Sequence, residues 1–119
     1  MEERMKEIVS YVDAHREEMI ALWKDLVNLE GSSREKENLD KVAARIKEAM
    51  EEAGIAVTMV EDGPVPAEAP ITVLGMVGAD RPGKPVVLSG HYDTVFPKGT
   101  FGENPFRIEG DKALSLIHI

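Results

Sequence analysis

The sequence contains no cysteine, so it can form no disulfide bond and offers no thiolate ligand to a metal ion. Any metal site must therefore use histidine, aspartate or glutamate, and only three histidines are present. The glycines do not fall in the spacing of a phosphate-binding loop or a dinucleotide fingerprint. There is no nucleophile elbow either. These absences narrow the candidate chemistry to imidazole and carboxylate groups.

Basic residues are fewer than acidic residues. The chain carries 14 Lys and Arg against 22 Asp and Glu, which gives a formal net charge of −8. An acidic surface repels phosphates, so we expect no nucleic-acid partner and no anionic membrane partner. No apolar run reaches the length of a membrane span, and the first 19 residues lack the apolar core of a signal peptide. We therefore expect a cytoplasmic protein.

Two helical patterns fill the first half of the chain. Apolar residues recur at spacings of three, four and seven over residues 5–26, which predicts one long amphipathic helix ended by Gly31. A second apolar stripe over residues 39–53 predicts another helix. Ser32 and Glu35 have the spacing of a capping box at its start.

Short β-prone runs follow the helices: residues 55–60, 71–77, 86–89 and 106–109. Proline and glycine mark residues 61–70 as a loop and residues 78–85 as a turn. Because Val86, Val87 and Leu88 show no polar alternation, the third run predicts a central strand buried on both faces. Helices followed by such strands predict an α/β layer structure in which helices cover a sheet.

His91 and Asp93 stand just past the end of that third run. In open α/β sheets ligands gather at the carboxyl ends of strands, so this is a favourable position for a site. Residues two apart in an extended segment point to the same side. An imidazole can bind Zn²⁺ through one nitrogen while the other donates to a carboxylate. The alternative is a purely structural role in which His91 and Asp93 cap a loop, and spacing alone favours that role.

Other candidates carry weaker signals. His15 and Trp23 lie on the first helical stripe, where a packed structural role is expected for each. His118 has no second ligand near it in the sequence. Ser89 could serve a hydrolase of another class, but in an extended strand its side chain points away from His91. None of these four residues therefore displaces the pair His91 and Asp93.

Residues 86–113 resemble the first metal-site segment of a family of zinc-dependent exopeptidases. The resemblance rests on an apolar strand, the run Gly-His-x-Asp-x-Val at residues 90–95, and a later Pro-Phe-x-x-x-Gly-Asp turn at residues 105–111. The family includes glutamate carboxypeptidase, aminoacylase, acetylornithine deacetylase and succinyl-diaminopimelate desuccinylase. The sequence of this segment is most similar to the glutamate carboxypeptidase branch. The helical region ahead of it is also similar to the helix pair that precedes the first strand in the family.

The resemblance implies a fold as well. Residues 1–113 would be the N-terminal portion of a three-layer catalytic domain, truncated, with two helices followed by strands of a mostly parallel, mixed sheet. Residues 114–119 do not match the family pattern, so we expect them to be a separate tail that is either poorly ordered or packed without a specific partner.

The family resemblance also implies a chemistry. His91 would bind one zinc of a two-zinc site, with Co²⁺ or Mn²⁺ as substitutes, and Asp93 would be the catalytic carboxylate that orients the His91 ring. The reaction would be hydrolysis of an amide next to a free carboxylate, in a small peptide or an N-acyl amino acid. The full-length parent is expected to be a homodimer.

The sequence departs from the family after residue 113. The bridging Asp, the Glu-Glu pair with the general base and the remaining metal ligands have no counterpart here. We therefore expect these 119 residues to be an inactive fragment of such an enzyme. The alternative is a small, non-catalytic α/β binding or structural domain.

Overall fold

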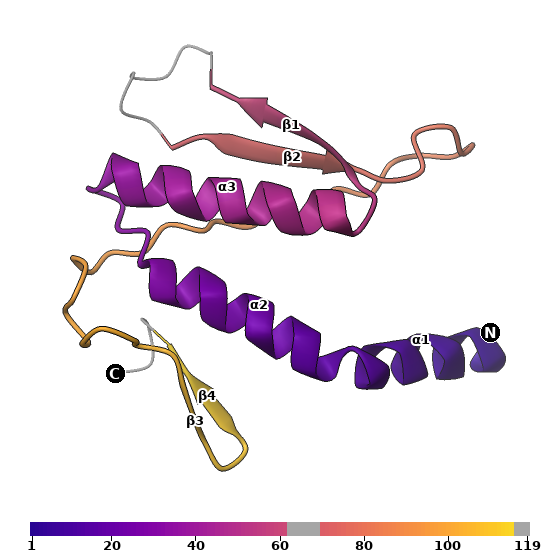
Figure 1. Cartoon of the computed structure of the whole chain (residues 1–119). Helices are drawn as coiled ribbons and strands as arrows, with labels where there is room; N and C mark the ends of the chain where they lie inside the picture. The colour runs from indigo at the N-terminus through magenta and orange to yellow at the C-terminus, as the bar shows by residue number, and fades with distance from the viewer. Residues whose placement is uncertain (62–69, 116–119) are drawn as a thin grey trace.

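The computed structural model describes residues 1–61 and 70–115, and that part of the chain is a small α/β structure. Its helices and strands, in chain order, are α1 (Glu2–Ala14), α2 (Arg16–Leu29), α3 (Lys36–Glu52), β1 (Ala56–Val60), β2 (Thr72–Met76), β3 (Arg107–Glu109) and β4 (Lys112–Leu114). The β1–β2 hairpin lies on one side of α3, and α2 lies on the other (Figure 1). The predicted loop at residues 61–70 falls mostly outside the described residues.

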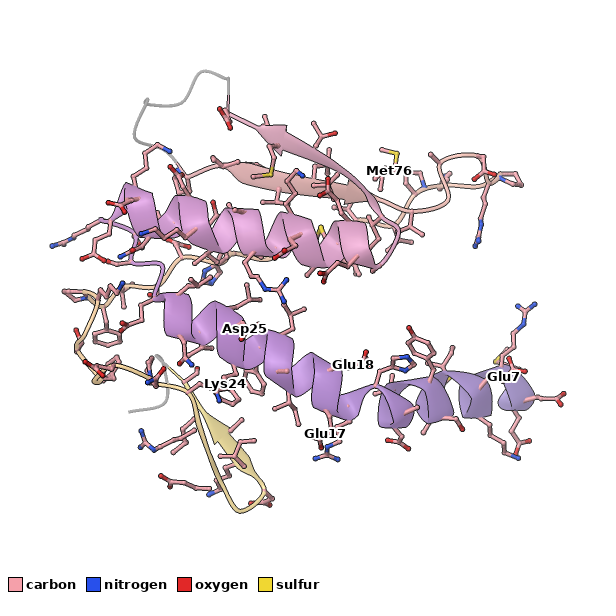
Figure 2. All side chains as sticks on the ribbon, viewed as in Figure 1. Glu7, Glu17, Glu18, Lys24, Asp25 and Met76 are labelled. Carbon is pink, nitrogen blue, oxygen red and sulfur yellow. The ribbon has the colours of Figure 1, made fainter. Side chains whose placement is uncertain are left out.

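The predicted long first helix is in fact two helices. The chain leaves helical geometry at His15, which has φ −104° and ψ 12°. There the His15 Nδ1 lies 2.8 Å from the Tyr11 carbonyl oxygen, and the two rings stack with centroids 4.0 Å apart. Because α1 buries none of its residues, packing does not force it to stay in line with α2. Figure 2 shows Glu7, Glu17 and Glu18 on the open surface of these helices.

The connection between α2 and α3 also differs from the prediction. Glu30, not Gly31, adopts the left-handed conformation that ends α2, with φ 52°. The predicted capping box is wrong: Glu35 is the N-cap of α3 and no side chain caps the helix. Ser32 contributes its backbone oxygen instead, which accepts the Glu35 N–H at 2.9 Å.

Helix α3 is the centre of the small core, and its position matches the predicted second helix. Leu39, Val42 and Ala43 are its buried residues, and they recur on one face at helical spacing. On another side of the helix, the Met50 side chain approaches Gly75 of β2, where a Cβ would lie 3.0 Å from the Met50 sulfur. The absence of a side chain at Gly75 therefore allows the hairpin to lie close to α3.

The hairpin confirms two predicted strands. β1 and β2 pair antiparallel with Thr58 opposite Leu74, and burial alternates along β1 as expected for a sheet with one covered face. β3 and β4 form a second antiparallel hairpin, with Ile108 opposite Ala113. Strand β3 covers residues 107–109 of the predicted run at 106–109, and Leu114 at the end of β4 pairs with Arg107.

The predicted central strand at residues 86–89 is wrong for the described structure. These residues pair with no strand, and Val86, Val87 and Leu88 are 86%, 81% and 94% exposed. A strand buried on both faces needs neighbours at its edges and layers above and below, which the described residues do not supply. The mostly parallel sheet is likewise not observed, since both described sheets are antiparallel pairs.

The fold is open. The radius of gyration is 16.6 Å, against about 13–14 Å for a compact chain of this length. The accessible surface is 9604 Å², against about 6400 Å² for a folded monomer of this mass. Within the described residues, none of the helices is both long enough and apolar enough to cross a bilayer.

Candidate metal-ligand site

His91 and Asp93 are in direct contact just past the extended segment of residues 86–89. The His91 Nδ1 lies 3.1 Å from the Asp93 Oδ1 and 3.1 Å from the Asp93 carbonyl oxygen. The His91 side chain is 85% exposed, and its Nε2 has no hydrogen-bond partner among the described residues. The Nδ1 of His91 is thus bonded to a carboxylate, and its Nε2 is open to a ligand.

The second oxygen of Asp93 has its own partner. Ser33 donates a hydrogen bond from its Oγ to the Asp93 Oδ2 at 2.7 Å, across 60 positions of sequence. This hydrogen bond is the largest cause of a lowered pKa for Asp93; burial acts in the opposite direction, and His91 lowers the pKa further. Asp93 is therefore held as a carboxylate, which is the form that accepts from both neighbours.

Tyr92, between the two, has a different partner. Its hydroxyl donates to the Ile71 carbonyl oxygen at 2.6 Å, next to the start of β2. Burial raises the pKa of Tyr92, and the charges of Asp40 and Asp93 act in the same direction. The neutral phenol therefore holds the segment that carries His91 and Asp93 to the start of the hairpin strand β2.

A shallow hollow of about 390 Å³ adjoins the site. His91, Tyr92 and Asp93 form its polar side. The remaining lining residues come mainly from α3, β2 and the extended segment: Ile46, Met50, Pro70, Thr72, Val73, Leu88 and Gly90. The imidazole thus lies at the rim of a mostly apolar depression.

The loop that follows the site is fixed by the end of α2. Glu30 is only 3% exposed, and its carboxylate oxygens accept the Gly99 N–H at 3.0 and 3.2 Å. The Asn28 side chain accepts the Phe106 N–H at 3.1 Å. Ser33, Glu30 and Asn28 were not identified from the sequence, because their partners lie 60 to 78 positions away and no local pattern marks them.

The described residues do not contain a complete metal site. Groups of three or more His, Asp or Glu side chains placed to hold a metal are absent from residues 1–61 and 70–115. Structural and catalytic zinc sites use three or four protein ligands, whereas this site supplies one imidazole nitrogen with an orienting carboxylate. The His91 imidazole can therefore supply one ligand to a metal ion, and the described residues do not supply the others.

The other candidates are not part of this site. The His15 ring is occupied with Tyr11, as expected for a structural histidine. Trp23 packs edge to face on the buried Phe106, with centroids 5.3 Å apart, but is itself 43% exposed and so only partly a core residue. Ser89 is exposed, and the hydrogen bonds of the His91 ring go to Asp93 and not to the Ser89 hydroxyl. His118 lies outside the described residues.

Comparison with known proteins relates the chain to a carboxypeptidase. It is similar to carboxypeptidase G2 of Pseudomonas sp. (strain RS-16), with 31% identity over 96 residues. The matched region is 80% of this chain but 22% of the relative, so the chain spans about a fifth of that protein's length. No family model matches the chain. No solved structure matches it.

Proposed function

We propose that residues 1–113 form the N-terminal portion of the three-layer catalytic domain of a two-zinc metallopeptidase of the glutamate carboxypeptidase kind. In this proposal, residues 114–119 lie outside the domain. The observation that carries the proposal is the hydrogen bond between His91 and Asp93, which leaves the Nε2 of His91 open to a metal. The similarity to a carboxypeptidase supports the same class of reaction.

In this proposal His91 holds one zinc through Nε2 and Asp93 fixes the ring and its tautomer. Zinc, when bound, would lower the pKa of a water molecule and polarise the scissile carbonyl. The other ligands and the general base would come from polypeptide outside the described residues. The complete enzyme would be a cytoplasmic homodimer that hydrolyses an amide next to a free carboxylate, in a small peptide or N-acyl amino acid.

A graft tests this function. Residues 1–113 would replace the matching region of carboxypeptidase G2, and the hybrid would be assayed for zinc content and for release of glutamate from glutamate-terminated amides. We expect His91→Ala to abolish activity and reduce bound zinc. Asp93→Asn should cost about 10–100-fold in activity or zinc affinity. His15→Ala is the matched control, because His15 also bonds through Nδ1 yet lies outside the site.

Two results would count against the proposal. Unimpaired activity and zinc content in both site variants of an active hybrid would reject the metal-ligand assignment. A folded hybrid that binds no zinc at all would favour the alternative of a non-catalytic α/β binding domain.

A further inference from the structure

The connection between α2 and α3 meets the candidate site through a short stretch of parallel pairing. The Ser33 N–H donates to the Thr94 carbonyl at 2.7 Å, and the Thr94 N–H donates to the Gly31 carbonyl at 2.8 Å. Ser32 and Thr94 form a parallel bridge between these bonds. Two segments far apart in sequence are therefore locked in register next to Asp93.

The connection is itself fixed to the core. Gly31 is buried against α3, where a Cβ would lie 3.0 Å from the Val42 Cγ2 and 3.3 Å from the Leu39 Cδ2. Val42 and Leu39 are among the most buried residues of the chain. Because the backbone cannot move far toward α3, the Ser33 hydroxyl is presented to Asp93 from a fixed position.

The hydroxyl has one proton and two acceptors within reach. The Asp93 Oδ2 lies at 2.7 Å and the Thr94 carbonyl oxygen at 2.9 Å. A hydrogen bond to a charged acceptor is stronger than one to a neutral acceptor, so the carboxylate takes the proton. Ser33 does not cap α3, whose first turn has no side-chain cap. Its hydroxyl is therefore directed at the site rather than at a helix end.

We propose that Ser33 is a positioning residue for the candidate site. By holding Oδ2 of Asp93, it directs Oδ1 at the Nδ1 of His91. The imidazole then carries its proton on Nδ1 and presents an unprotonated Nε2, the form in which a histidine binds a metal. The positioning step stands on geometry alone, and only its use in metal binding rests on the proposed function.

The test compares Ser33→Thr with Ser33→Val, two variants of nearly equal shape that differ in the hydroxyl. Ser33→Ala also removes the hydroxyl, but without adding a branch at Cβ. Ser32→Ala is the control, since the Ser32 hydroxyl accepts from the Arg34 N–H and not from a group of the site. The readout is the His91 tautomer in the metal-free chain at a fixed pH above 7, from long-range ¹H–¹⁵N correlation spectra. We expect the Nδ1–H tautomer to dominate in wild type, Ser33→Thr and Ser32→Ala, and its share to fall in Ser33→Val and Ser33→Ala.

An unchanged tautomer in Ser33→Val, with the backbone amide signals of residues 92 and 94 in place, would overturn the positioning role. A Zn²⁺ titration of the same samples separates this outcome from failure of the proposed function. We expect affinity at His91 to fall by up to about tenfold in Ser33→Val, the lower end of the range for groups that orient a ligand. A changed tautomer with no zinc response at His91 would support the positioning role and reject the metal.

Discussion

At the scale of residues, Asp93 divides its two oxygens between two partners, His91 and Ser33. A carboxylate bound on both sides has little freedom to rotate, so the imidazole it contacts is held as well. Spacing in the sequence predicted that His91 and Asp93 share one side of an extended segment, although spacing alone favoured a loop cap over a site. It could not predict Ser33, whose position depends on how α2 and α3 return to the segment.

The lowered pKa of Asp93 predicts a pH dependence of stability. Its folded-state pKa lies below the unfolded value of about 3.9, so the stabilisation is complete above that pH and is lost as the pH falls through the folded pKa. Because Ser33 is the largest cause, Ser33→Ala should move the Asp93 pKa back toward 3.9. Carboxyl ¹³C titration measures this directly. An identical Asp93 titration in wild type and Ser33→Ala would contradict the assignment.

The buried contact of Glu30 with Gly99 predicts an effect on the free energy of unfolding. Glu30→Ala would leave the Gly99 N–H without its acceptor and should lower the free energy of unfolding by about 1–3 kcal/mol. Glu30→Gln keeps one side-chain oxygen as an acceptor and should cost less. Urea denaturation of the three chains measures the difference. Equal stability of Glu30→Ala and wild type would show that the contact with Gly99 contributes nothing.

At the scale of elements, α3 was predictable because its apolar periodicity coincides with the face it buries. Strands β1 and β2 were predictable from two β-prone runs on either side of a loop rich in proline and glycine, but their antiparallel pairing was not predicted. Residues 86–89 have the composition of a buried strand but lie exposed, because burial depends on neighbouring layers and not on the strand itself. The break at His15 was missed because the apolar stripe continues through it.

This contrast between α3 and the extended segment can be measured. Leu39 is buried in α3, so Leu39→Ala should destabilise the chain by about 2–5 kcal/mol. Leu88 is almost fully exposed, so Leu88→Ala should change the free energy of unfolding by less than about 0.5 kcal/mol. Urea unfolding followed by helical circular dichroism gives both values. A loss at Leu88 as large as at Leu39 would show that residues 86–89 are buried in solution.

At the scale of the whole molecule, the chain exposes more surface than a compact protein of its mass, and apolar residues contribute to it on α1 and at residues 86–88. An apolar, unpaired segment invites association. We expect the chain to self-associate and to melt with low cooperativity while retaining helical circular dichroism.

The substitution Val87→Lys should weaken this self-association, because a charge on an exposed extended segment opposes its pairing with a second copy of the chain. Thr100→Lys places the same charge on an exposed residue of the following loop and is the control. Sedimentation velocity at several concentrations measures the effect. A monomeric wild-type chain with a sharp, reversible melt would instead indicate a self-sufficient domain.

The most direct test of His91 as an open metal ligand is a zinc titration of the 119-residue chain, read at each histidine ring by NMR. A single open imidazole nitrogen should bind Zn²⁺ weakly and respond first at His91, because a charged carboxylate holds its other nitrogen, whereas the Nδ1 of His15 meets the neutral Tyr11 carbonyl oxygen. The rings of His15 and His118 serve as internal controls. We expect a selective, weak response at His91 that is lost in His91→Ala, with no hydrolysis of glutamate-terminated substrates. A response at His15 equal to that at His91, or tight stoichiometric binding with turnover, would contradict it.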